Sequence, residues 1–131
     1  MSVFGNYASA EVVDAAEKFI SKMDERDLAA AIEQSERTMS PHGRSLLVEA
    51  IFDAFRQRGE SSEDVVEAAG TALEAAVRGD ESAVRALLAY ARSNAGLLKE
   101  AATVLIERSP AVVSELAPVL ADGIARRLRK R

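Results

Sequence analysis

The sequence of 131 residues contains no cysteine and no tryptophan, and histidine occurs only once. Without cysteine the chain has no disulfide, no thiolate metal ligand and no cysteine nucleophile. Proteins without disulfides are typical of reducing compartments, so we expect a cytoplasmic location. The composition therefore excludes thiol-dependent catalysis and disulfide-stabilised folds.

Long apolar runs are also absent. No stretch approaches the ~18 uncharged apolar residues that a membrane-spanning helix requires. The N-terminal residues Met1-Ser2-Val3-Phe4-Gly5 lack the basic region and apolar run of a signal peptide. We therefore expect a protein with no membrane span.

Aromatic residues make up only 5% of the chain, whereas hydrophobic residues make up 48% and charged residues 29%. The core must therefore be aliphatic, and the many alanines favour helices that pack closely together. A chain of this length is typical of one domain with a real core. We predict a single helical domain over residues 1–131, with an N-terminal segment at 1–8 that contains a Gly5-Asn6 turn.

Helix start and stop signals divide almost the whole chain into short amphipathic segments. The predicted N-caps are Ser9, Asp24, Ser40, Ser61 or Ser62, Asp80 and Ser109. The predicted stops are Gly59, Gly79 and Gly96. These signals predict an all-α fold, a compact irregular bundle of six or seven short helices. The recurrence of helix pairs leaves one alternative, a short HEAT-like helical repeat array.

Two predicted helical segments contain a glycine or a proline in their interior, Gly70 in one and Pro118 in the other. We expect one helix from about residue 62 to 78, with Val66, Ala69, Leu73 and Val77 inward and Gly70 allowing close helix approach. Pro118 interrupts the last helical pattern, which predicts either a kink or a new helix that begins at this proline. The apolar stripe Leu120, Ile124 and Leu128 would then close the core or pack on a second subunit.

The net charge of −4 conceals an uneven distribution. Residues 1–125 carry 12 Lys and Arg against 21 Asp and Glu, a net charge of −9. The basic tip, residues 126–131, carries five positive charges: Arg126, Arg127, Arg129, Lys130 and Arg131. Such a tip attracts an acidic protein surface, including the body of another copy, or the phosphates of nucleic acid or lipid. The plain alternative is a favourable placement of cations at a helix C-terminus.

The single histidine lies in Ser40-Pro41-His42-Gly43-Arg44, at the start of a predicted helix. His42 and Arg44 with the free backbone amides would form an anion site, and His42 alone would be a general base. The alternative is an exposed residue in the first helical turn. A catalytic histidine needs an orienting partner and a nucleophile, which the local sequence does not clearly provide.

Carboxylates gather in two places, at Glu60, Glu63, Asp64 and Glu67 and at Glu49 and Asp53. Paired carboxylates can bind a divalent cation or divide acid and base roles. The chain has neither a calcium-binding loop motif nor a Glu-x-x-His pair, so a solvated acidic face is the simpler interpretation. Five further acids precede a base by four residues, as in exposed helical ion pairs: Asp14–Lys18, Glu33–Arg37, Glu74–Arg78, Glu81–Arg85 and Asp122–Arg126.

The glycines match no phosphate-binding loop, and we expect no cofactor. The scarcity of catalytic side chains favours a non-catalytic, small helical protein–protein interaction module that associates with itself. One alternative is a nucleic-acid-associated accessory protein that binds weakly and nonspecifically through the basic tip. A second alternative is an enzyme or metal binder built on carboxylates, Tyr90 and His42.

Overall fold

The computed structural model describes residues 7–130, and the secondary structure in this range is entirely helical. Its elements are α1 (Ser9–Lys22), α2 (Glu25–Thr38), α3 (Pro41–Gln57), α4 (Ser62–Ala69), α5 (Leu73–Arg78), α6 (Glu81–Arg92), α7 (Leu97–Arg108), the 3₁₀ helix η2 (Pro110–Glu115) and α8 (Pro118–Arg129). The all-α prediction is confirmed. The predicted turn at Gly5-Asn6 and the tip residue Arg131 lie outside the described residues.

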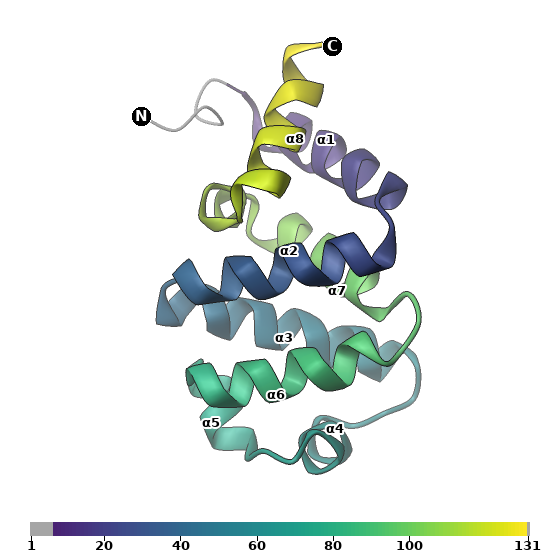
Figure 1. Ribbon diagram of the computed structural model, residues 1–131, viewed down its shortest axis with the longest axis vertical. Coiled ribbons are helices and arrows are strands. Elements are labelled where there is room, and N and C mark those ends of the chain that lie inside the picture. Colours follow the sequence, from purple (N-terminus) through teal and green to yellow (C-terminus); the bar gives the residue numbers. More distant parts are fainter. Residues whose placement is uncertain (1–6, 131) are drawn as a thin grey trace.

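The helices are stacked one above another along the long axis of the molecule (Figure 1). The helices α1 and α8 pack on each other at one end, and α4 and α5 form the other end. Between them, α7 packs along α3, and α2 packs on α6. The main contacts thus join helices that are distant along the chain, whereas repeat arrays join neighbouring units. The fold is therefore an irregular bundle rather than a HEAT-like array.

Three predicted N-caps are confirmed by hydrogen bonds to backbone amides. The Asp24 carboxylate accepts from Arg26 N at 3.0 Å, and Ser40 Oγ accepts from Gly43 N at 3.0 Å. Ser61 Oγ accepts from Asp64 N at 3.2 Å and begins α4. Each bond satisfies a donor that the first helical turn leaves without an intrahelical partner. These local contacts explain why the sequence predicts the starts of α2, α3 and α4 accurately.

Three other predicted caps are wrong in detail. Ser9 is the first residue of α1, and Ala8 occupies the N-cap position. Asp80 precedes α6, but its carboxylate accepts from Arg78 at 2.7 Å instead of capping the helix. Ser109-Pro110 begins the 3₁₀ helix η2 without a side-chain cap. The α-helix begins at Pro118, so the second alternative for this segment is confirmed.

The helix predicted across residues 62–78 is broken in two at Gly70. This residue has φ +78° and ends α4, a backbone conformation that glycine adopts without steric cost. A Cβ built on Gly70 meets no atom within 4 Å, so its predicted packing role is wrong. Val77, predicted to face inward, is 47% exposed on α5. This break and the separate start of α8 at Pro118 explain why residues 7–130 form more helices than predicted.

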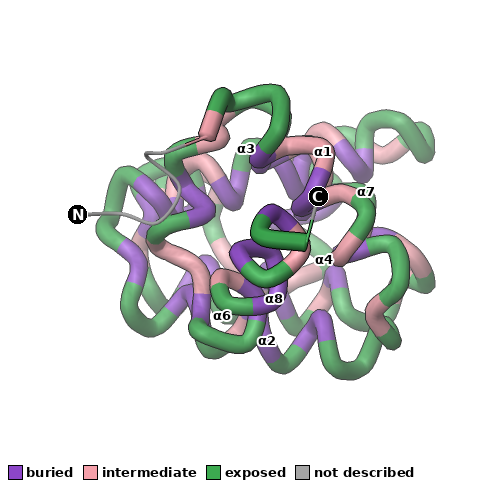
Figure 2. The backbone as a smooth tube through the Cα atoms, turned by 90° about the horizontal axis from the view of Figure 1, so that it is seen from above, coloured by how far each residue is buried: buried purple, intermediate pink, exposed green. Residues whose placement is uncertain are grey.

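The predicted aliphatic core is present. Leu47, Ile51, Phe55 and Leu88 are buried, and Leu73 is half-buried. The stripe Leu120, Ile124 and Leu128 of α8 is also buried within this single chain. Figure 2 shows buried and exposed residues alternating along the helices, as expected for amphipathic helices around a shared interior. The α8 stripe thus closes the core.

Over residues 7–130, none of the helices combines the length and the apolar character that crossing a membrane would require.

Candidate functional site: a cationic cleft between α1 and α8

The described residues of the basic tip, 126–130, occupy the last turn of α8 and its C-cap. Arg126, Arg129 and Lys130 are exposed, and Arg127 is half-buried. Their positions follow from the buried stripe of α8, because residues between the stripe positions of an amphipathic helix face solvent. The tip is therefore held on an ordered helix that is packed against α1.

A glycine sets how closely the two helices approach. Gly123 of α8 is buried against the ring of Phe19 of α1, and a Cβ at this position would collide with that ring. The absence of a side chain therefore lets the aromatic ring lie directly on the α8 backbone. This contact forms the floor of the space between the helices.

An open cleft of about 520 Å³ lies between α1 and α8. It is lined by Asp14, Ala15, Lys18, Phe19, Gly123, Arg126, Arg127 and Lys130. We call this set of residues the cationic cleft, because it holds four cations and one acid. The three cations from α8 belong to the predicted site, whereas Lys18 joins them only through the packing of α1.

The cations of the tip are not paired within the described part of the chain. Lys18 Nζ lies 3.1 Å from Asp14 Oδ2, the pair that the sequence predicts. Arg126, Arg127, Arg129 and Lys130 make no side-chain hydrogen bond or ion pair with any residue in 7–130. The predicted Asp122–Arg126 pair is thus absent, and the charge of these side chains is available to a partner.

Cations elsewhere are used differently. Of the 12 Lys and Arg in residues 1–125, all but Lys22, Arg26 and Arg37 bond through their side chains to a carboxylate or a backbone carbonyl. Two of the five predicted pairs form, Asp14–Lys18 and Glu81–Arg85. Glu33 pairs with Arg92 instead, which joins α2 to α6. The concentration of unpaired cations distinguishes the cleft from the rest of the surface.

Near the cleft, α1 also carries Glu17, which lies close to Glu107 of α7. A hydrogen bond with Glu107 raises the pKa of the Glu17 carboxyl, and burial and the nearby Glu107 and Asp14 charges raise it further. Glu17 therefore lies on the side of α1 that faces Glu107 of α7, whereas Asp14 lines the cleft. They add no cation to the cleft.

The predicted anion site at the start of α3 is filled by the chain itself. Glu115 of η2 accepts from Ser40 N at 3.2 Å and from Ser40 Oγ at 3.0 Å. Arg44 is buried, and it donates from Nε to Gly79 O at 2.7 Å and from Nη1 to Met39 O at 2.6 Å. His42 is exposed, and its side chain has no hydrogen-bond partner among the described residues. The structure thus assigns Arg44 to internal bonding and does not bring it together with His42 around a free anion.

The predicted carboxylate cluster is exposed on α4. Glu63, Asp64 and Glu67 face solvent, and Glu60 accepts a hydrogen bond from Tyr90 Oη at 3.1 Å. Burial raises the pKa of the Tyr90 phenol, and the Glu60 carboxylate adds to this shift. Within residues 7–130, no group of three or more His, Asp or Glu side chains is placed to hold a metal ion. This arrangement gives the carboxylate-based alternative no assembled site.

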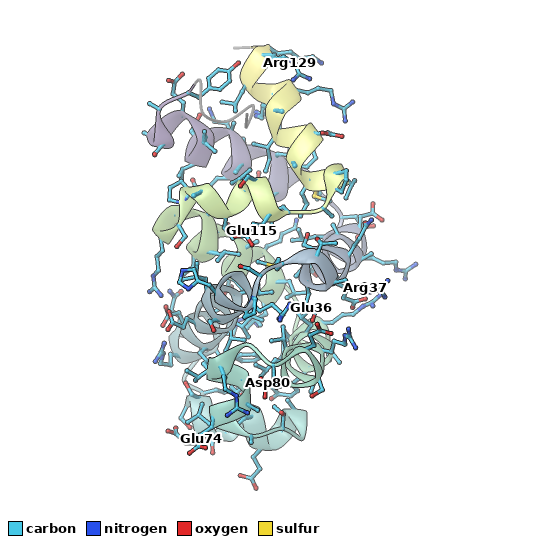
Figure 3. The ribbon with its side chains drawn as sticks, turned by 90° about the vertical axis from the view of Figure 1, so that its left-hand side faces the viewer. Glu36, Arg37, Glu74, Asp80, Glu115 and Arg129 are labelled. Carbon is cyan, nitrogen blue, oxygen red and sulfur yellow. The ribbon has the colours of Figure 1, made fainter. Side chains whose placement is uncertain are left out.

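A buried carboxylate that the sequence analysis did not single out lies between α2 and α6. Figure 3 labels Glu36 in the middle of the molecule. Its side chain is 1% exposed, and its Oε2 lies 3.5 Å from Arg85 Nε. Its other oxygen has no hydrogen-bond partner in the described part of the chain. Glu36 lies four residues after Ile32 and eight after Leu28, so helical spacing places it on the buried face of α2. This signal was missed because the residue is charged. The cleft residues Asp14, Phe19 and Gly123 were missed because they line it only through the α1–α8 packing.

Comparison with protein-family models, with curated proteins and with solved structures gives no match to this chain.

Proposed function

We propose that this chain is a non-catalytic interaction module that binds an acidic protein surface through the cationic cleft. The observation that carries the proposal is the gathering of unpaired Arg126, Arg127 and Lys130 in one cleft. Like charges repel, so holding them together without internal partners opposes folding slightly. An anionic partner would remove that repulsion and gain several charge-assisted contacts. The proposal keeps the cytoplasmic location predicted from the cysteine-free sequence.

A protein partner fits the charge distribution better than a nucleic acid does. The rest of the chain carries a net charge of −9, which repels a polyanion that extends beyond the cleft. Asp14 adds a carboxylate within the cleft itself. Among the described residues that line the cleft, Phe19 carries the one aromatic ring, and it packs on Gly123 rather than offering a face for base stacking. A compact acidic patch on a protein avoids the first and the third difficulty, because it need not extend beyond the cleft and needs no ring face for stacking.

The test compares two fluorescent probes of equal charge, an oligoglutamate peptide and a single-stranded oligonucleotide, by anisotropy at low salt. We expect the peptide to bind more tightly, and the variant R126Q/R127Q/K130Q to weaken its binding about tenfold or more. Raising the salt concentration should weaken binding to the wild type in the same direction, because the contacts are exposed.

The matched control is K22Q/R26Q/R37Q, which removes three exposed cations from α1 and α2 that have no ion-pair partner in the part of the chain the structure describes. This variant should bind the peptide like the wild type. Equal weakening by the two triple variants would overturn the cleft as the binding site. Tighter binding of the oligonucleotide than of the peptide would overturn the choice of a protein partner in favour of nucleic acid.

A further inference from the structure

We infer that the acidic surface recognised by the cationic cleft belongs to a second copy of this chain, so that the copies associate head to tail. This inference rests on the proposed function and names its partner. The surface in question is the acidic end, which we define as Glu60, Glu63, Asp64, Glu67 and Glu74 on α4, α5 and the preceding loop.

The acidic end is the counterpart of the basic tip. Residues 59–77 contain five carboxylates and no Lys or Arg. The two flanking bases, Arg58 and Arg78, pair with Glu100 and Asp80. The hydrogen bond with Asp80 raises the pKa of Arg78, and the charge of Glu74 adds to this shift. Glu63, Asp64, Glu67 and Glu74 are exposed, and none of them forms an ion pair with a described cation. Glu60 alone is engaged, by the hydroxyl of Tyr90. Unpaired carboxylates and unpaired cations therefore occur on the same chain in similar number.

The fold prevents these two surfaces from meeting within one chain. The helices α1 and α8 lie at one end of the long axis, and α4 and α5 lie at the other (Figure 1). Figure 3 shows Arg129 and Glu74 at these opposite ends. The opposite charges can therefore neutralise each other only between molecules, with the cleft of one copy on the acidic end of the next.

The contact we infer joins two different surfaces, so it is heterologous. Such contacts generate rings when the rotation between copies closes and open chains when it does not. Val77, 47% exposed on α5, adds an apolar side chain next to the carboxylates. Exposed ion pairs are individually weak and are screened by salt, so the association should be weak and salt-sensitive. It should therefore appear at high protein concentration and low salt.

A charge-swap experiment tests the pairing directly. One variant, R126E/R127E/K130E, reverses the cleft, and a second, E63K/E67K/E74K, reverses the acidic end. In each variant alone both surfaces carry the same sign, so sedimentation velocity should show monomers where the wild type shows larger species. In an equimolar mixture every reversed surface meets a complementary one, and association should return to the wild-type level.

Control variants separate loss of charge pairing from loss of folding. The variant K22E/R26E/R37E should associate like the wild type, and circular dichroism should show unchanged helicity in every variant. Because Arg127 is half-buried, R126E/R129E/K130E provides a second reversed tip that leaves this residue intact.

The outcomes distinguish this inference from the proposed function. A mixture that stays monomeric, or a wild type that is monomeric at high concentration, would overturn head-to-tail association. If the wild type nevertheless binds oligoglutamate through the cleft, the proposed function stands and its partner is another acidic protein. Loss of oligoglutamate binding in the K22E/R26E/R37E control to the same extent as in the reversed cleft would overturn both.

Discussion

Most arginines in the body of the molecule bond to other parts of the chain, whereas the described arginines of the C-terminal tip do not. Arg44 crosses from α3 to the backbone at Gly79, and Arg58 reaches Glu100 of α7 at 3.0 Å. These side chains connect segments far apart in the sequence. Those of the tip, such as Arg126 and Arg127, connect nothing within residues 7–130. Whether a cation connects parts of the fold thus depends on the partners within its reach rather than on its residue type.

The strongest test of this contrast is removal of Arg44. The variant R44A leaves the carbonyls of Gly79 and Met39 without their charged donor and removes a buried alkyl chain. We expect the free energy of unfolding to fall by about 3 kcal/mol, measured by urea denaturation. Binding of oligoglutamate by the folded protein should not change. A loss below about 1 kcal/mol would mean that Arg44 is dispensable for folding, as the tip is expected to be.

Removing the Arg85 side chain should have an intermediate effect on stability, because this residue is half-exposed but contacts the buried acid Glu36. R85A leaves the Glu36 carboxylate buried without its cation, and we expect a loss of about 1–3 kcal/mol in urea denaturation. The background E36Q provides the control, because a neutral amide needs no counter-charge. In the E36Q variant, R85A should lower the free energy of unfolding by less than it does in the wild type. An equal loss in both proteins would show that the Glu36–Arg85 pair does not contribute to stability.

The smallest effect on stability is expected at the tip. Replacing Arg126, Arg127 and Lys130 by glutamine should change the free energy of unfolding by less than about 0.5 kcal/mol, because no described contact is lost. Thermal unfolding of this variant beside the wild type checks the expectation. A large loss would contradict the distinction between body and tip and assign these cations a structural role.

Local signals in the sequence predicted much of the fold. The caps at Asp24, Ser40 and Ser61 depend on residues two or three positions apart, so they can be read without tertiary information. The break at Gly70 was missed because the apolar pattern continues through it, and only the positive φ reveals the end of α4. Intrinsic patterns therefore predict helix starts better than they predict interruptions.

The sequence predicted only the α8 part of the candidate site, because the α1 part joins it through packing between distant segments. The cations near the end of α8 are close together in the sequence, so the sequence alone predicts that they cluster. Lys18 and Phe19 join them because α1, more than a hundred residues away, packs on α8 through Gly123. The predicted anion site at His42 and Arg44 is wrong because Glu115 and the Gly79 carbonyl come from distant segments, and Arg44 also bonds to the nearby Met39 carbonyl.

The amino-acid sequence by itself determined that this chain is helical, where most helices begin, and that its charge is acidic with a basic tip. These properties follow from periodicity and from contacts within one or two helical turns. Only the tertiary structure decided which cations are paired, which helices form the cleft, and that the basic and acidic surfaces lie at opposite ends. The reason is that electrostatic pairing depends on distances in space, and packing sets those distances only when the core closes.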